Sequence, residues 1–86
     1  MDEIAEWRNC IDEIDSRLLE LLNERARCAC RIGKIKARKA MKIRNPDRER
    51  EIMARLRELN RGPLTDTAIQ TIFRQIIDEC RSIEGK

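Results

Sequence analysis

The clearest pattern in this chain is an apolar stripe near the amino terminus, with members at alternating steps of three and four residues. This spacing places side chains on one face of an α-helix and predicts a helix over about residues 2–41. At 1.5 Å per residue the helix is roughly 60 Å long, which exceeds the diameter of a small domain. We therefore expect it to protrude and to need a partner along its stripe. The stripe consists of Ile4, Trp7, Ile11, Ile14, Leu18 and Leu21.

Two shorter amphipathic segments follow the long one. Asn45 precedes Pro46, which is the order of a capping residue and a first helical residue, so a second helix is expected over about 46–59. A glycine-proline pair then interrupts the helical pattern. A third helix is expected over about 65–84. The sequence predicts an all-α, three-helix protomer with a single domain.

Composition limits the possible function classes. Charged and hydrophobic residues each make up 41% of the 86 residues, which is typical of amphipathic helices. The net charge of +3 favours small anionic ligands over nucleic acid, and two aromatic residues are few for base stacking. The amino terminus has no apolar signal segment, and no apolar run approaches membrane-spanning length. We expect a cytoplasmic protein that binds neither nucleic acid nor membrane.

The cysteines do not predict a metal site. The chain has no histidine, and Cys28 and Cys30 lie two residues apart on a helix, so they face away from each other. In a reducing compartment we expect free thiols at Cys10 and Cys80 as well. Neither a metal nor another cofactor is expected.

Two cations occupy places in the long helix where hydrocarbon is expected. Arg25 continues the stripe, and Lys36 lies in the neighbouring row, close to a whole number of turns later. A buried cation is costly unless it is paired, so we expect an anion between them. Arg48 and Glu49 begin the second helix, where backbone N–H groups favour an anion, and Glu84 could add a carboxyl group. Together they suggest a pocket for a small molecule with several negative charges.

The alternative is that these are ordinary surface charges. Arg25 would extend its charged end into solvent, Lys36 would be solvated, and Arg48 and Glu49 would only balance charge on the surface. Periodicity alone leaves both interpretations open. Arg8 adds a constraint, because it lies about 25 Å before Arg25 on the same rigid helix. It could share a compact pocket with Arg25 only if a second chain packs antiparallel and supplies it.

The order of these residues resembles the all-α chorismate mutases from about Trp7 to Glu84. An arginine is followed by Ile-Gly-Lys-x-Lys, then by Pro-x-Arg-Glu and by Ile-Phe-Arg, at spacings that are specific to that family. The matching segments are 8–15, 18–25, 32–36, 46–49, 62–64 and 72–77.

The resemblance implies an intertwined homodimer that rearranges chorismate to prephenate, on the pathway to phenylalanine and tyrosine. Carried over position by position, Arg8 would be borrowed from the partner chain, and both it and Arg25 would bind substrate carboxylates with support from Arg48. Glu49 would accept a hydrogen bond from the ring hydroxyl. Lys36 would meet the ether oxygen.

Three positions depart from one well-known version of the family pattern. Asn45 stands where an aspartate near the hydroxyl is frequent. Cys80 replaces a serine that touches a carboxylate, so that hydrogen bond is weakened or lost. Glu84 replaces a glutamine that donates to the ether oxygen, although some members carry glutamate there. As a catalytic group beside Lys36, Glu84 can donate only when it is protonated.

Other functions stay open on sequence grounds. An isochorismate-pyruvate lyase with the same fold would use a closely related anion pocket. A non-catalytic helical dimer could bind a small anionic effector through the same cations. The chain could be a free-standing enzyme or the mutase segment of a fused one.

Overall fold

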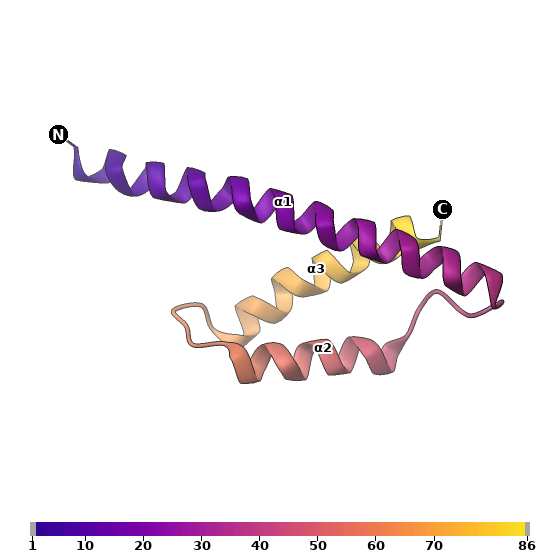
Figure 1. Cartoon of the computed structure of the whole chain (residues 1–86). Helices are drawn as coiled ribbons and strands as arrows, with labels where there is room; N and C mark the ends of the chain where they lie inside the picture. The colour runs from indigo at the N-terminus through magenta and orange to yellow at the C-terminus, as the bar shows by residue number, and fades with distance from the viewer. Residues whose placement is uncertain (1, 86) are drawn as a thin grey trace.

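The computed structural model describes residues 2–85, and they form three α-helices. These are α1 (Glu3–Arg38), α2 (Pro46–Leu59) and α3 (Asp66–Glu84) (Figure 1). The all-α prediction is confirmed, and the second helix has the bounds expected for it. The third helix begins at Asp66, with the Thr65 hydroxyl accepting the Ala68 N–H as its cap.

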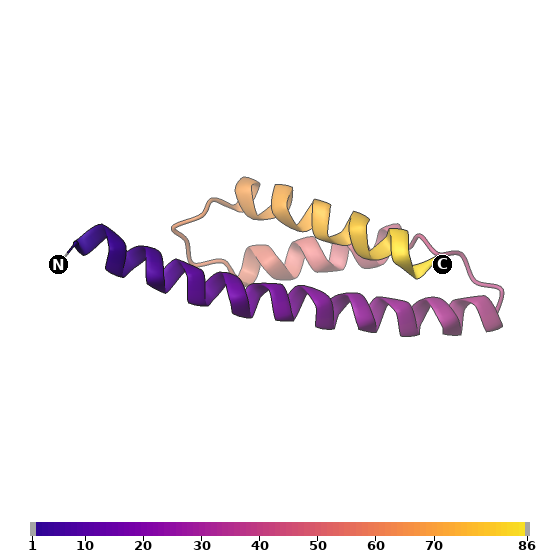
Figure 2. The same cartoon turned by 90° about the horizontal axis from the view of Figure 1, so that it is seen from above.

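The third helix lies between the other two helices. Figures 1 and 2 show α3 running in the same direction as α1, with α2 antiparallel to both. It packs against α1 and against α2, whereas within residues 2–85 no Cα atom of α1 lies within 8 Å of a Cα atom of α2. The buried apolar core is correspondingly small, and its members come from all three helices: Ala29, Ile52, Ile77 and Cys80.

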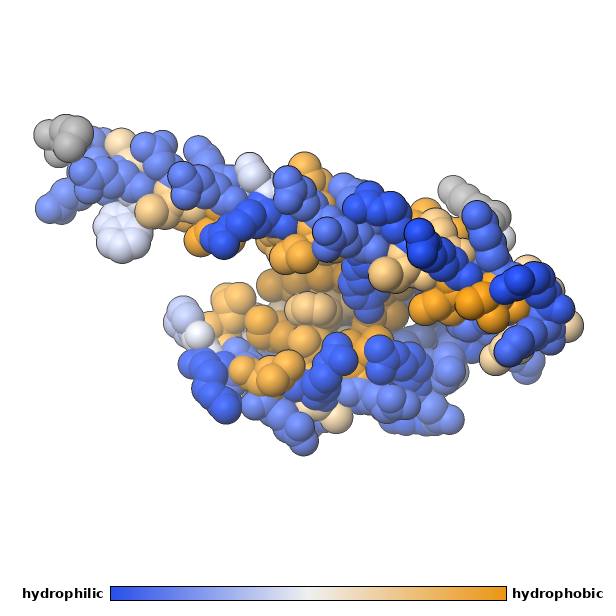
Figure 3. All heavy atoms as spheres, in the orientation of Figure 1, coloured by the Kyte–Doolittle hydropathy of each residue, from blue (hydrophilic) through white to orange (hydrophobic). Residues whose placement is uncertain are grey.

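The amino-terminal part of α1 extends beyond the other two helices, as expected from its length. The molecule is 58 Å long in its largest dimension, and the free end of α1 is visible in the space-filling view (Figure 3). The apolar stripe on this part is exposed: Trp7 keeps 70% of its accessible surface and Leu18 keeps 49%. Large apolar side chains in such a contiguous row mark an interaction surface.

The long helix ends at Arg38, three residues before the predicted end. Ala40 has a positive φ of 54°. The Met41 N–H donates to the Lys36 carbonyl at 2.8 Å, and the Ala40 N–H donates to the Ala37 carbonyl at 3.3 Å. These bonds form a Schellman motif. The position with positive φ usually holds glycine, so an alanine there gave no stop signal in the sequence.

Candidate active site

A cavity of about 440 Å³ lies where the three helices and the segment between α1 and α2 come together. It includes every predicted site residue except Arg8. Five cations and two acids line it: Arg25, Lys36, Arg48, Arg55, Arg81, Glu49 and Glu84. The uncharged part of the wall contains Cys28, Ala29, Ile32, Ile43, Asn45, Ile52, Ile77 and Cys80. This excess of positive charge around partly apolar walls suits a small molecule with more than one negative charge.

Lys36 is paired inside the cavity rather than solvated. Its Nζ lies 2.8 Å from Glu84 Oε1, and only 13% and 11% of the two side chains are exposed. The Nζ also donates to the Ile43 carbonyl at 2.5 Å. The contact with Glu84 lacks the alignment of a hydrogen bond, so it is an ion pair. The surface-charge alternative is therefore wrong for Lys36.

Gly33 explains how Glu84 reaches this position. A Cβ atom at Gly33 would overlap the backbone carbonyl of Glu84. Glycine thus lets the last turn of α3 approach the backbone of α1 closely, which offsets its poor helix propensity. The need for a glycine at this position is therefore explained by the close backbone contact.

Arg25 lies in the cavity wall one helical turn before Ala29. Its side chain is half-buried. No carboxylate within residues 2–85 lies within ion-pair distance of it. Arg25 therefore brings a positive charge to the cavity that no acidic side chain of residues 2–85 offsets at close range.

Asn45 and Arg48 open α2 in the predicted way. The Asn45 side chain caps the helix, because its Oδ1 accepts the Arg48 N–H at 3.1 Å. The Arg48 side chain is 54% exposed and lies 3.5 Å from Glu51. Exposed pairs of this kind contribute little to stability. The Arg48 side chain also borders the cavity.

Glu49 is buried in the wall of the cavity and is surrounded by arginines. Its Oε1 accepts a hydrogen bond from Arg74 at 2.7 Å, and its Oε2 accepts one from Arg81 at 3.3 Å. The Arg74 hydrogen bond lowers the pKa of the Glu49 carboxyl below its ordinary value, and the charges of Arg44, Arg74 and Arg81 act in the same direction against burial.

The cysteines add two thiols to the cavity wall. Cys80 is buried there, and Cys28 is exposed. All four cysteines of the chain are free thiols. In the described part of the chain, no three potential ligand side chains come close enough together to hold a metal ion.

Sequence reasoning missed Arg55 and Arg81, which also border the cavity. A signal for each was present. Arg55 follows Arg48 by seven residues, so the two share a helix face, and Arg81 follows the buried Ile77 by four. Neither arginine was predicted as a site residue, because a cation on an amphipathic helix is usually solvated.

The sequence profile of the family described as chorismate mutase type II matches residues 7–85. The chain belongs to this family. It is 44% identical over its full length to a bifunctional chorismate mutase/prephenate dehydratase of Aquifex aeolicus, of which it covers 25%. It is 33% identical to a chorismate mutase of Methanocaldococcus jannaschii, with 98% of this chain and 86% of that protein covered.

The fold agrees with solved structures of the same family. Form II of a chorismate mutase from Thermus thermophilus superposes with a TM-score of 0.97 at 29% identity, covering 99% of this chain and 97% of that one. The chain spans about a quarter of the length of the bifunctional relatives that it matches. None of the helices in residues 2–85 has the length and apolar character needed to cross a bilayer.

Proposed function

We propose that the chain converts chorismate to prephenate, the mutase step that leads towards phenylalanine and tyrosine. The observation that carries the proposal is the cavity of this family member, where five cations and two acids surround a partly apolar space. Chorismate is a dianion of a size that such a cavity suits. The reaction is a unimolecular rearrangement, so binding and electrostatic stabilisation can supply the catalysis.

Each charged group has a proposed task in that reaction. Arg25 and Arg48 bind the substrate carboxylates and hold the molecule in its folded, reactive conformer. Lys36 stabilises the negative charge that grows on the ether oxygen as the C–O bond breaks. Glu49 accepts a hydrogen bond from the ring hydroxyl. Cys80 and Asn45 border the same substrate as weaker contacts.

Glu84 has two alternative states in this scheme. In the ion pair with Lys36 it is a carboxylate, and a carboxylate only accepts hydrogen bonds. To assist Lys36 at the ether oxygen it must carry a proton. We therefore propose that the active complex contains protonated Glu84, with the substrate taking over the negative charge beside Lys36.

The remaining task falls to Arg8, and it requires a second copy of the chain. Arg8 does not line the cavity, and it lies about 25 Å from Arg25 along α1. The exposed stripe of the same segment supports a homodimer in which two α1 helices pack antiparallel. Each cavity would then receive Arg8 from its partner.

Charge along α1 supports the antiparallel arrangement. Within α1, residues 3–24 contain seven acidic residues and two arginines, whereas residues 25–38 contain six cations and no acid. In an antiparallel pair, the acidic part of each chain would lie along the basic part of the other. In a parallel pair, like charges would face each other, which is unfavourable.

The deciding experiment is to incubate the purified protein separately with chorismate and with isochorismate and to identify the products. Prephenate from chorismate is the expected result. Salicylate and pyruvate from isochorismate, without prephenate from chorismate, would replace the proposal with the lyase. No turnover of either compound would favour a non-catalytic helical dimer that binds a small anion.

A further inference from the structure

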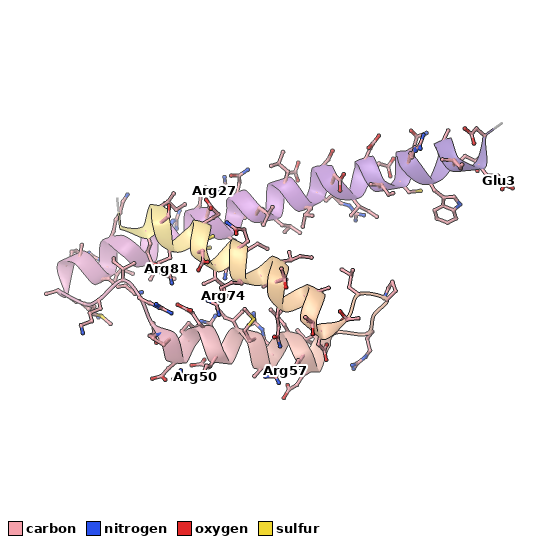
Figure 4. The ribbon with its side chains drawn as sticks, turned by 180° about the vertical axis from the view of Figure 1, so that it is seen from behind. Glu3, Arg27, Arg50, Arg57, Arg74 and Arg81 are labelled. Atoms are coloured by element: carbon pink, nitrogen blue, oxygen red, sulfur yellow. The ribbon has the colours of Figure 1, made fainter. Side chains whose placement is uncertain are left out.

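The arginine cluster around Glu49 has a specific geometry. Glu49 is the buried charged residue of residues 2–85, with 8% of its surface exposed. Arg74 binds one carboxylate oxygen and Arg81 the other, while the Arg44 Nε lies 3.6 Å from the second oxygen. The cluster joins α2 to α3, and Figure 4 labels Arg74 and Arg81 on α3. Since both oxygens are held from the same helix, the carboxylate cannot rotate freely.

Arg81 is itself held by an acid on the same helix. It donates through Nη2 to Asp78 at 3.2 Å and through Nη1 to Glu49, so its guanidinium bridges the two carboxylates. Residues 74, 78 and 81 are one turn apart in sequence and share a face of α3, but Arg74 lies 4.0 Å from Asp78 and makes no hydrogen bond to it. Asp78 thus restrains the Arg81 guanidinium, which in turn restrains Glu49.

We propose that Arg74 and Arg81 are positioning residues. They hold the Glu49 carboxylate in the cavity wall at the place where it accepts a hydrogen bond from the substrate hydroxyl. This inference rests on the proposed function. A carboxylate offers about four acceptor positions, and the two hydrogen bonds from the arginines leave capacity for one from the substrate. Neither arginine was assigned a role by the family pattern, and Arg81 also borders the cavity directly.

The charge state of Glu49 agrees with this task. Its lowered pKa means that the carboxyl stays ionised to lower pH than an ordinary glutamate does. The other charged groups at the same cavity are the cations Arg25, Lys36, Arg48 and Arg55 and the acid Glu84. Loss of Arg74 removes the largest influence on this pKa. The pKa of Glu49 should then rise. As the pH is lowered, the variant should therefore lose activity at a higher pH than the unchanged protein does.

A purely structural role is the competing explanation, because the same contacts also connect α2 to α3. A structural connection would lower stability when it is removed, but it would leave the pH dependence of the remaining folded enzyme unchanged. The test therefore needs a pH profile as well as a rate. Arg57 provides the matched control, since it is exposed on α2 and outside the cluster, and Arg57→Gln removes the same charge.

The experiment compares Arg74→Gln and Arg81→Gln with Arg57→Gln and with the unchanged protein. We expect kcat/KM for chorismate to fall about 10- to 100-fold in the first two, as for the loss of a hydrogen bond to a charged group. The acid side of the profile should move to higher pH in Arg74→Gln, and Arg74→Lys should restore part of both effects. Carbon-13 NMR of the Glu49 carboxyl should show the same direction of change.

The outcomes distinguish the positioning role of the arginines from the proposed mutase activity. An active unchanged protein, with an Arg74→Gln profile that matches that of Arg57→Gln, would overturn the positioning role alone. The same holds if the Glu49 carboxyl titrates identically in these two variants. An unchanged protein that turns over no chorismate would overturn the proposed function, and the assigned role with it. If Arg74→Gln fails to fold, Arg74→Lys and Arg81→Gln decide by the same criteria.

Discussion

The two halves of α1 share one apolar periodicity but differ in what surrounds them. Ala29 and Gly33 in the carboxyl-terminal half are the buried residues of the helix, and this half packs against α3. The amino-terminal half carries a stripe of larger apolar residues, and all of them are exposed (Figure 3). The chain itself thus covers the helix face at Ala29 and Gly33. The large apolar side chains stay exposed along the amino-terminal half and also at Ile32 and Ile35. Periodicity identifies the face of a helix but not the partner that covers it.

The strongest challenge to this comparison is a charge placed on the exposed stripe. Ile14 is 51% exposed, so in a protein that works as a monomer Ile14→Glu should change stability by no more than about 0.5 kcal/mol. In the proposed homodimer it buries a charge, separates the chains and withdraws Arg8 from both sites. We expect activity to fall by more than the roughly 100- to 1000-fold that loss of one preorganised donor costs.

Sedimentation equilibrium and the chorismate assay measure the two effects of Ile14→Glu. Ser16→Glu is the matched control, because it adds the same charge to the same helix at a position outside the stripe. It should remain dimeric and active. An Ile14→Glu protein that has full activity and an unchanged mass would show that the stripe is not an interface.

A second prediction tests whether the two halves of α1 serve different sites. Arg8→Ala and Arg25→Ala should each lower kcat/KM by about 100- to 1000-fold. If Arg8 acts across the interface, chains refolded together in equal amounts should regain about a quarter of the normal activity, because half of the dimers form one complete site. Activity that stays at the level of the separate variants would contradict the supply of Arg8 across the interface.

A third prediction concerns the close packing of the carboxyl-terminal half. In a free helix Gly33→Ala should stabilise by about 1 kcal/mol. Here the new Cβ meets the Glu84 carbonyl, so the last turn of α3 must move. We expect a net destabilisation of about 1–3 kcal/mol, measured by urea denaturation, together with lower activity because Glu84 shifts. Lys34→Ala, an exposed neighbour on the same helix, is the control. A stabilised Gly33→Ala protein would contradict the observed contact.

The smallest effect is expected from Glu84→Gln, because the amide has nearly the size of the carboxyl group and always offers an N–H donor. If position 84 assists Lys36 by donating to the ether oxygen, kcat for chorismate should stay within about tenfold of that of the unchanged protein. A larger loss of kcat would remove Glu84 from the role of donor and leave Lys36 to act there alone.

Much of the fold and part of the site could be predicted from the sequence, because both depend on local spacing. Helical periodicity placed Arg25 and Lys36 on the same wall, and the Asn45-Pro46 pair marked the start of α2. The end of α1 was missed because Ala40 adopts a conformation in which glycine is usual. The cluster around Glu49 was missed because Arg74 and Arg81 follow Glu49 by 25 and 32 residues. Their contact with Glu49 depends on how α3 packs against α2.

The position of α3 between α1 and α2 means that the shape of the cavity can be changed separately from its charges. Within residues 2–85, no Cα atoms of α1 and α2 lie within 8 Å of each other, and α3 supplies part of the wall between them. Ile77 and Cys80 are buried in that part of the wall. A protein engineer could vary these two positions to admit larger or smaller dianions while leaving the cations of α1 and the helix start of α2 in place.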